Sequence, residues 1–156
     1  MKKQLISMNA CYEATEWIGD RNLEQAYAEC TRADWLIWYA KQMNVSTQKL
    51  ILASALCADT VRHLVTEENL KYLDTAILYG KGQATFEELC EVPAWIGCDT
   101  PVTTHASSAV VYIQFCDGDS AYQAALALPD PDYALEKMAD IVRSVITLED
   151  LKGGEQ

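Results

Sequence analysis

The chain lacks basic residues over a long central stretch. No Lys or Arg stands between Lys81 and Lys137, and the net charge of the 156 residues is −11. The same stretch holds nine acidic residues: Glu87, Glu88, Glu91, Asp99, Asp117, Asp119, Asp130, Asp132 and Glu136. Nucleic acids and anionic membranes are bound by basic surfaces that displace counterions, so both are excluded as main partners. The acidic stretch indicates either a solvated face that keeps the protein soluble or a docking surface for a basic protein partner.

The chain also lacks a long apolar run. The longest unbroken one, from Trp35 to Ala40, is far too short to cross a bilayer. The beginning, Met1-Lys-Lys followed by Leu5 and Ile6, has no apolar segment of the kind found in a signal peptide. We therefore expect a cytoplasmic protein with no membrane partner.

Motifs for metals, cofactors and catalysis are missing as well. The six cysteines form no CxxC pair, and the two histidines, His63 and His105, have no close cysteine neighbour. Cys57 and His63 are six residues apart, a spacing that does not share a helical face. Gly80-Lys-Gly82 lacks the frame of a phosphate-binding loop. We expect reduced thiols, no metal, no cofactor and no enzymatic activity. Four cysteines lie in helical apolar patterns, where we expect small buried side chains: Cys11, Cys30, Cys57 and Cys90.

Helix signals are frequent and strand signals are rare. Apolar residues recur at helical spacing behind capping residues and before Gly or Pro. They predict helices at about 9–18, 22–30, 32–43, 46–65, 66–80, 85–92, 103–113, 120–128 and 132–146. The predicted N-cap residues include Asn9, Asn22, Ser46 or Thr47, and Asp132. Only the run 109–115 is also β-prone. The expected fold is all-α: one domain, 1–156, forming a compact bundle or short stack of about eight or nine helices, with an irregular loop at 93–102.

The segment 32–42 combines aromatic residues with an acid. Trp35, Trp38 and Tyr39 share one helical face, which is typical of a packed core and also of a binding hot spot. Thr31 and Asp34 have the spacing of a capping box, as do Thr85 and Glu88. We interpret the aromatic residues as core anchors and Asp34 as a helix-capping residue.

Several strings are similar to a known family. The chain resembles the helical immunity-protein family of bacterial toxin systems, which phages also carry. The likeness covers most of the chain and is carried by Ala10-Cys11-x-x-Ala14-x-x-Trp17, Leu23-Glu24-Gln25-Ala26-Tyr27-x-x-Cys30, Asp34-Trp35-Leu36-x-Trp38, Leu56-Cys57-Ala58, Ala76-x-x-Tyr79-Gly80-x-Gly82-x-Ala84-Thr85-x-Glu87-Glu88-Leu89 and Ala139-Asp140-Ile141-Val142-Arg143. The segment 91–115 departs from the Ala/Tyr tract of that family. The resemblance implies a non-catalytic protein that binds and neutralises a toxin domain or a defence component.

Two functions follow as hypotheses. The first is stoichiometric binding of a basic protein through acidic residues, namely Glu87, Glu88, Glu91, Asp99, Asp117 and Asp119. The second is sequestration of a small molecule, a nucleotide or metabolite, in a pocket between helices lined by Trp35, Trp38, Arg62, His63 and Arg143. DNA mimicry ranks lower, because nine acids over 55 residues form too sparse an array. A homo-oligomer is compatible with either hypothesis.

Overall fold

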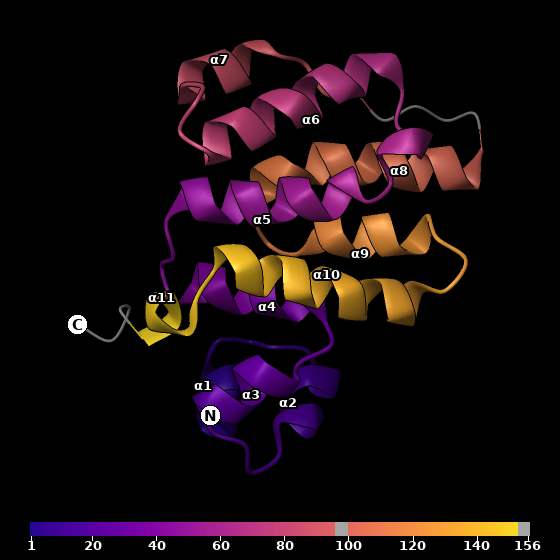
Figure 1. Cartoon of the computed structure of the whole chain (residues 1–156). Coiled ribbons are helices and arrows are strands. Elements are labelled where there is room, and N and C mark those ends of the chain that lie inside the picture. The colour runs from indigo at the N-terminus through magenta and orange to yellow at the C-terminus, as the bar shows by residue number, and fades with distance from the viewer. Residues whose placement is uncertain (96–99, 153–156) are drawn as a thin grey trace. The chain divides into compact units, whose positions relative to one another are not determined.

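The computed structural model describes residues 1–95 and 100–152 (Figure 1). These residues form eleven α-helices and two short 3-10 helices, with no strand among them, so the all-α prediction is confirmed. Eight of the helices have seven or more residues. We predicted one domain, and contacts group the chain into two compact units, Met1–Cys30 and Thr31–Gln156, which are described separately. No helix within the described ranges has the length and apolar character needed to span a membrane.

The first unit holds α1 (Lys2–Ser7), α2 (Tyr12–Ile18) and α3 (Leu23–Glu29). Asn22 caps α3 as predicted, because its side chain accepts from the backbone N–H of Gln25 at 2.9 Å. The predicted cap at Asn9 is wrong: Asn9 has a left-handed φ of 59° after α1, and α2 begins behind Cys11. Cys11 is exposed, against expectation.

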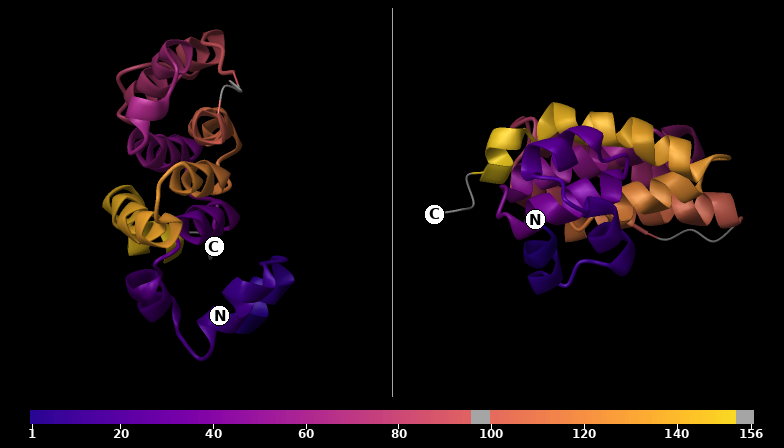
Figure 2. Two further views of the ribbon diagram at one scale, coloured as in Figure 1. Left: turned by 90° about the vertical axis from the view of Figure 1, so that its right-hand side faces the viewer. Right: turned by 90° about the horizontal axis from the view of Figure 1, so that it is seen from below.

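The second unit holds the remaining helices. They are α4 (Ala33–Gln42), α5 (Thr47–Asp59), η1 (Arg62–Leu64), α6 (Glu67–Gly80), α7 (Phe86–Glu91), α8 (Pro101–Val111), η2 (Tyr112–Phe115), α9 (Asp119–Leu126), α10 (Pro131–Val145) and α11 (Leu148–Lys152). Within this unit α7 packs on α6, α6 on α5, α9 on α8 and α5, and α10 on α4, α5 and α9. Figure 2 shows these layers nearly end-on. The stack prediction matches this arrangement.

Small buried side chains let the central helices approach one another. Alanines of α5, α8 and α9 are fully buried: Ala53, Ala55, Ala58, Ala106, Ala109, Ala121, Ala124 and Ala125. The hydroxyl of Ser120 lies at 3.1 Å from the carbonyl oxygen of Ser54 and 2.7 Å from that of Ala109, so it links all three helices. Gly80 on α6 lies against Leu52, where an added Cβ would come within 2.5 Å. The central layers are therefore held by close backbone packing.

Several boundaries differ from the prediction. The helix from Ser46 ends at Asp59 and gives way to η1, rather than running to Val65. The irregular loop ends at Thr100, because Pro101 occupies the first helical position, where proline is favoured, and Thr100 caps α8. Residues 96–99 of the predicted loop lie outside the described residues. The β-prone run 109–115 is helical, since it is packed among helices that offer no strand partner.

Two predicted caps are also wrong, for identifiable reasons. The capping box of Thr31 and Asp34 does not form, because the guanidinium of Arg32 donates to both Asp34 oxygens at 2.9 and 2.6 Å. The last long helix is capped by Asp130 rather than Asp132, with Pro131 at its first position. In the first case Arg32 is the N-cap residue, and its side chain also pairs with Asp34. In the second case Asp130, two residues before Asp132, is the N-cap residue.

Candidate partner-binding site

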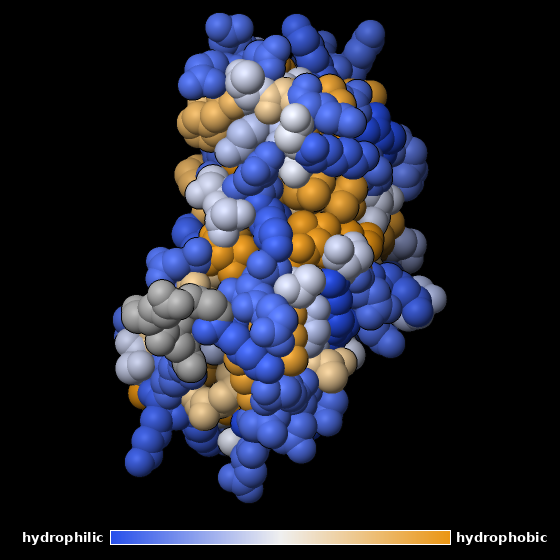
Figure 3. All heavy atoms as spheres, turned by 60° about the vertical axis from the view of Figure 1, so that its left-hand side comes forward, coloured by the Kyte–Doolittle hydropathy of each residue, from blue (hydrophilic) through white to orange (hydrophobic). Residues whose placement is uncertain are grey.

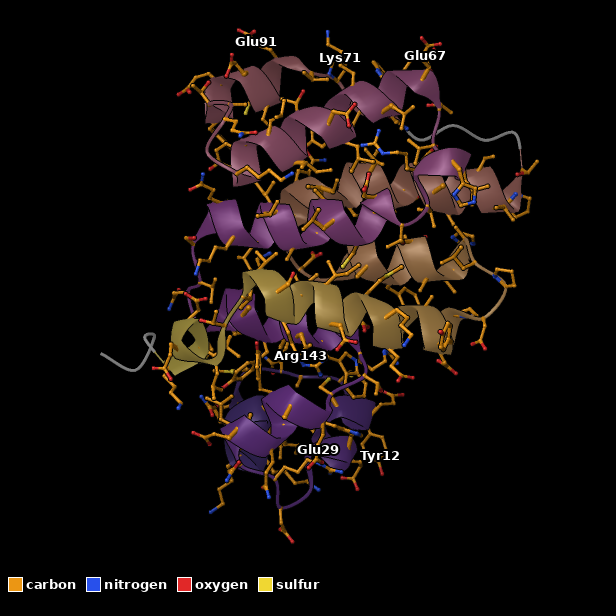
Figure 4. The ribbon with its side chains drawn as sticks, in the orientation of Figure 1. Tyr12, Glu29, Glu67, Lys71, Glu91 and Arg143 are labelled. Carbon is orange, nitrogen blue, oxygen red and sulfur yellow. The ribbon has the colours of Figure 1, made fainter. Side chains whose placement is uncertain are left out.

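The α6–α7 hairpin carries an exposed acidic surface. We define the α6–α7 surface as Glu67, Glu68 and Lys71 of α6 with Glu87 and Glu91 of α7. Figure 4 shows Glu67, Lys71 and Glu91 pointing outward on one side of the hairpin. In Figure 3 the upper part of the second unit shows many hydrophilic side chains, with hydrophobic ones among them. The sequence predicted Glu87 and Glu91 as contact residues, and the structure places them here with the α6 acids.

Local structure explains how α7 is held. Its first turn has the predicted capping box: Glu88 N–H donates to the Thr85 hydroxyl at 3.1 Å, and Thr85 N–H donates to the Glu88 carboxylate at 2.7 Å. The rings of Tyr79 and Phe86 lie 5.7 Å apart and Leu89 is buried, which fixes α7 on α6. Glu88 therefore has a structural role, in addition to the contact role predicted for it.

The carboxylates of the α6–α7 surface have no ion pair among the described residues, a property that they share with acids outside the hairpin, namely Asp117, Asp119, Asp130, Asp132 and Glu136. Other carboxylates of the second unit do pair with cations: Asp34 with Arg32, Asp59 and Asp74 with Arg62, Asp140 with Arg143, Asp150 with Lys49 and Glu149 with Lys152. In the ranges that the structure describes, Glu67, Glu68, Glu87 and Glu91 have no such pair. The hairpin carries two basic residues, Lys71 on α6 and Lys81 directly after it. The surface is therefore a net negative region available to a partner.

Asp117 and Asp119 occupy a different environment. The turn before α9 presses against the first turn of α4, where a Cβ added to Gly118 would lie 2.3 Å from the Asp34 carbonyl oxygen. Partial desolvation raises the pKa of Asp119, and the charges of Asp117 and Asp34 raise it further, against the opposing effect of Lys41. The acids predicted as one set thus fall into two groups, one on α7 and the other at the turn into α9. Asp99 lies outside the described residues.

Sequence reasoning missed Trp95, the most exposed tryptophan described. Its side chain is 66% exposed, whereas its backbone is held by Asn69, which is 0% exposed. Asn69 Nδ2 donates to the Trp95 carbonyl oxygen at 2.5 Å, and Trp95 N–H donates to Asn69 Oδ1 at 2.8 Å. A tryptophan in a segment with no apolar periodicity was the signal that could have found it, because no helical stripe accounts for its presence.

A hollow of about 520 Å³ opens beside Trp95. Its walls come from the first turns of α6 and from the segment after α7: Glu67, Glu68, Lys71, Val92, Pro93 and Trp95. The hollow is continuous with the α6–α7 surface through Glu67, Glu68 and Lys71. It therefore joins an apolar and aromatic wall to a carboxylate-rich one.

Trp35 and Trp38 are half-buried, and Tyr39 is buried. The guanidinium of Arg32, already paired with Asp34, lies 4.7 Å from the Trp35 ring centroid and 5.9 Å from that of Tyr122. At these distances the guanidinium makes cation–π contacts with both rings. The interpretation as core anchors is correct for Tyr39 and only partly so for the two tryptophans.

The cations of the predicted small-molecule pocket are engaged with carboxylates. Arg62 of η1 donates to Asp59 at 2.6 Å and also to Asp74, and these bonds raise the pKa of the guanidinium above its usual value. Arg143 of α10 donates to Asp140 at 3.0 Å. His63 is exposed. The hollow beside Trp95 contains none of the five predicted residues, nor does a second, mostly apolar hollow of about 300 Å³ near Tyr133 and Met138.

The five cysteines within the described ranges fall into two groups. Cys30, Cys57 and Cys116 are buried, and Cys90 is exposed, contrary to its predicted burial. Burial raises the pKa of the Cys57 thiol far above its usual value and raises that of Cys116 to about 11. The raised pKa values mean that the thiols of Cys57 and Cys116 are not activated as nucleophiles. Within the described ranges, no group of three His, Cys, Asp or Glu side chains converges as a metal site.

No protein-family model, curated protein or solved structure matches this chain. The resemblance to the immunity-protein family accordingly stays a prediction.

Proposed function

We propose that this protein is a non-catalytic binding protein of the immunity or phage counter-defence kind. It neutralises a toxin or defence component by covering a basic surface of that protein with its α6–α7 surface. One observation supports the proposal above others: four exposed carboxylates, Glu67, Glu68, Glu87 and Glu91, share a hairpin whose basic residues are only Lys71 and Lys81. Such a surface attracts a basic partner from a distance and fixes its orientation.

The competing hypothesis, sequestration of a nucleotide or metabolite, receives less support. Phosphate recognition in an acidic protein needs a local cluster of available cations. Arg62 on η1 already donates to Asp59, and Arg143 on α10 already donates to Asp140. The two arginines therefore lie on different helical segments, and each is engaged with a carboxylate. Protein binding therefore has the stronger physical basis.

The test uses affinity capture from the native cell, followed by association kinetics with the purified partner. The informative variant is Glu87→Gln with Glu91→Gln, which spares Glu88 because that side chain caps α7. We expect association to slow by roughly 2- to 10-fold, with little change in dissociation, and affinity to fall as salt rises.

The matched control is Asp132→Asn with Glu136→Gln. It removes two charges at the same i, i+4 spacing from exposed positions of α10. We expect this control to associate almost as fast as the wild type. Equal slowing by both pairs, or an affinity that does not depend on salt, contradicts the proposed role of the α6–α7 surface.

A further inference from the structure

We propose that the hollow beside Trp95 receives a lysine or arginine side chain of the basic partner. This inference rests on the proposed function and names the chemistry that the site recognises. Trp95 supplies an aromatic face, Glu67 and Glu68 supply negative charge, and Val92 and Pro93 supply an apolar wall. The bound side chain would place its charged group by the carboxylates and its methylene stem against the apolar wall.

The two hydrogen bonds between the Asn69 side chain and the Trp95 backbone form a clamp that fixes the Trp95 backbone before any partner binds. Both backbone hydrogen bonds of the clamp come from a completely buried side chain, so the position of residue 95 is tied to the body of α6. Ordering of an anchor residue costs free energy when it occurs on binding, and here the backbone part of that cost is met in folding. A tryptophan held in place and left 66% exposed is the kind of residue that dominates interface energetics.

The charge around the hollow selects a cation over an anion. Glu67 and Glu68 lie in the first turn of α6, where negative charge also interacts favourably with the helix dipole. The dipole accounts for their position along α6 but not for an exposed indole beside them. Lys71 carries the one positive charge on the wall, and it would compete with an incoming cation for the same carboxylates. Removal of that charge should therefore strengthen binding, a result that a purely structural role of the hollow does not predict.

The experiment is ¹⁹F NMR of the full chain labelled with 5-fluorotryptophan. The chain has four tryptophans, so Trp17, Trp35 and Trp38 serve as internal references and Trp95→Phe assigns the remaining resonance. The probe is the peptide acetyl-(Lys-Gly)₄-amide, and its control is the same peptide with every lysine acetylated. We expect the basic peptide to shift the Trp95 resonance far more than the other three, and the acetylated peptide to shift none. Absence of a selective shift at Trp95 overturns the proposal.

Variants then test each wall of the hollow. Trp95→Ala should lower the affinity for the basic peptide by roughly 2- to 30-fold, the range expected for loss of a cation–π contact. Glu67→Gln with Glu68→Gln should reduce the shift at Trp95. Lys71→Glu should increase affinity, whereas Lys81→Glu, the same charge change at the exposed C-terminal end of α6, should not. Equal gains from Lys71→Glu and Lys81→Glu would indicate general charge attraction and would refute a specific site.

The two proposals can fail separately. If native-partner capture falls in Glu87→Gln with Glu91→Gln but is unchanged in Trp95→Ala, the proposed function stands and the cation site is wrong. If the peptide shifts Trp95 selectively but the captured partner associates equally fast with all variants, the site stands and the proposed function is wrong.

Discussion

Two acidic segments of similar sequence character differ sharply in the folded protein. Asp117 and Asp119 flank Gly118 in a turn pressed against α4, where desolvation and neighbouring acids raise the pKa of Asp119. Glu87 and Glu91 stand exposed on α7, with no ion pair in the described ranges. Asp119 is itself exposed and Asp117 half-buried, so the first segment differs from the second by the close packing of Gly118 on α4 and by the partial desolvation of Asp119. Acidic composition alone therefore does not identify a docking surface, because packing and neighbouring charges set how readily each carboxylate is ionised.

The largest expected effect comes from Gly118→Ala, which tests whether the first segment is structural. Gly118 has a φ of 98°, and its added Cβ would meet backbone of Asp34 at 2.3 Å. We expect a loss of about 2 to 4 kcal/mol in the free energy of unfolding, measured by urea denaturation.

Gly82→Ala is the control for Gly118→Ala. Gly82 also has a positive φ, of 71°, but its Cβ would meet only the end of the Gln48 side chain at 3.8 Å. Gly82→Ala should lower the free energy of unfolding by about 1 kcal/mol, the cost of the backbone conformation alone. Equal losses for the two variants would show that the approach to α4 is unimportant.

A fully paired acid extends the comparison. Lys49 Nζ donates to both Asp150 oxygens at 2.6 and 2.7 Å. Burial tends to raise the pKa of Asp150, but the bonds from Lys49 and Thr147 outweigh it and hold the pKa below its ordinary value. Asp150→Asn should cost about 1 kcal/mol at pH 7. The deficit should shrink as pH falls through the lowered folded pKa, since the wild type then loses the same stabilisation. A deficit that is constant with pH contradicts this reading.

Asp119 should show the opposite dependence. Its raised pKa means that the folded state holds a proton more tightly than the unfolded state. Its contribution to stability is therefore lost as pH rises from the ordinary value of 3.8 through the folded pKa. Over that pH window, the free energy of unfolding of Asp119→Asn should rise relative to that of the wild type, by less than about 0.5 kcal/mol. Paired urea curves below and above the window check the sign, and a relative loss would place Asp119 among the stabilising acids.

The smallest expected effect on stability is that of Glu87→Gln with Glu91→Gln. Both side chains are exposed without an ion pair in the described ranges, so the free energy of unfolding should change by no more than about 0.5 kcal/mol. Thermal unfolding alongside the association experiment checks this. A large destabilisation would show that these acids support the fold, and it would weaken the contrast with Asp117 and Asp119.

Local signals predicted part of the fold well. The caps at Asn22, Ser46 and Thr85 form as expected, because a capping side chain needs only the backbone three residues ahead. The cap at Thr31 fails because Arg32 takes the Asp34 carboxylate. The short helices α1 and α11 were missed, since six and five residues carry too little periodicity to recognise.

The candidate site was only half predictable. Glu87 and Glu91 are visible as charge in the sequence, and exposure requires no distant partner. The clamp of Trp95 by Asn69 joins residues 26 apart, and nothing local to either residue signals the pairing. The hollow itself exists only where the segment after α7 meets the first turns of α6.

By itself, the sequence determined the helical class, the caps at Asn22, Ser46 and Thr85, and the net negative charge, because each depends on residue type and short spacing. Only the tertiary structure decided which acids are neutralised, which thiols are buried and which tryptophan is presented outward. Those outcomes depend on contacts between residues far apart in the chain. The physical reason is that a charge or an aromatic ring changes its energy with its surroundings, and packing supplies those surroundings.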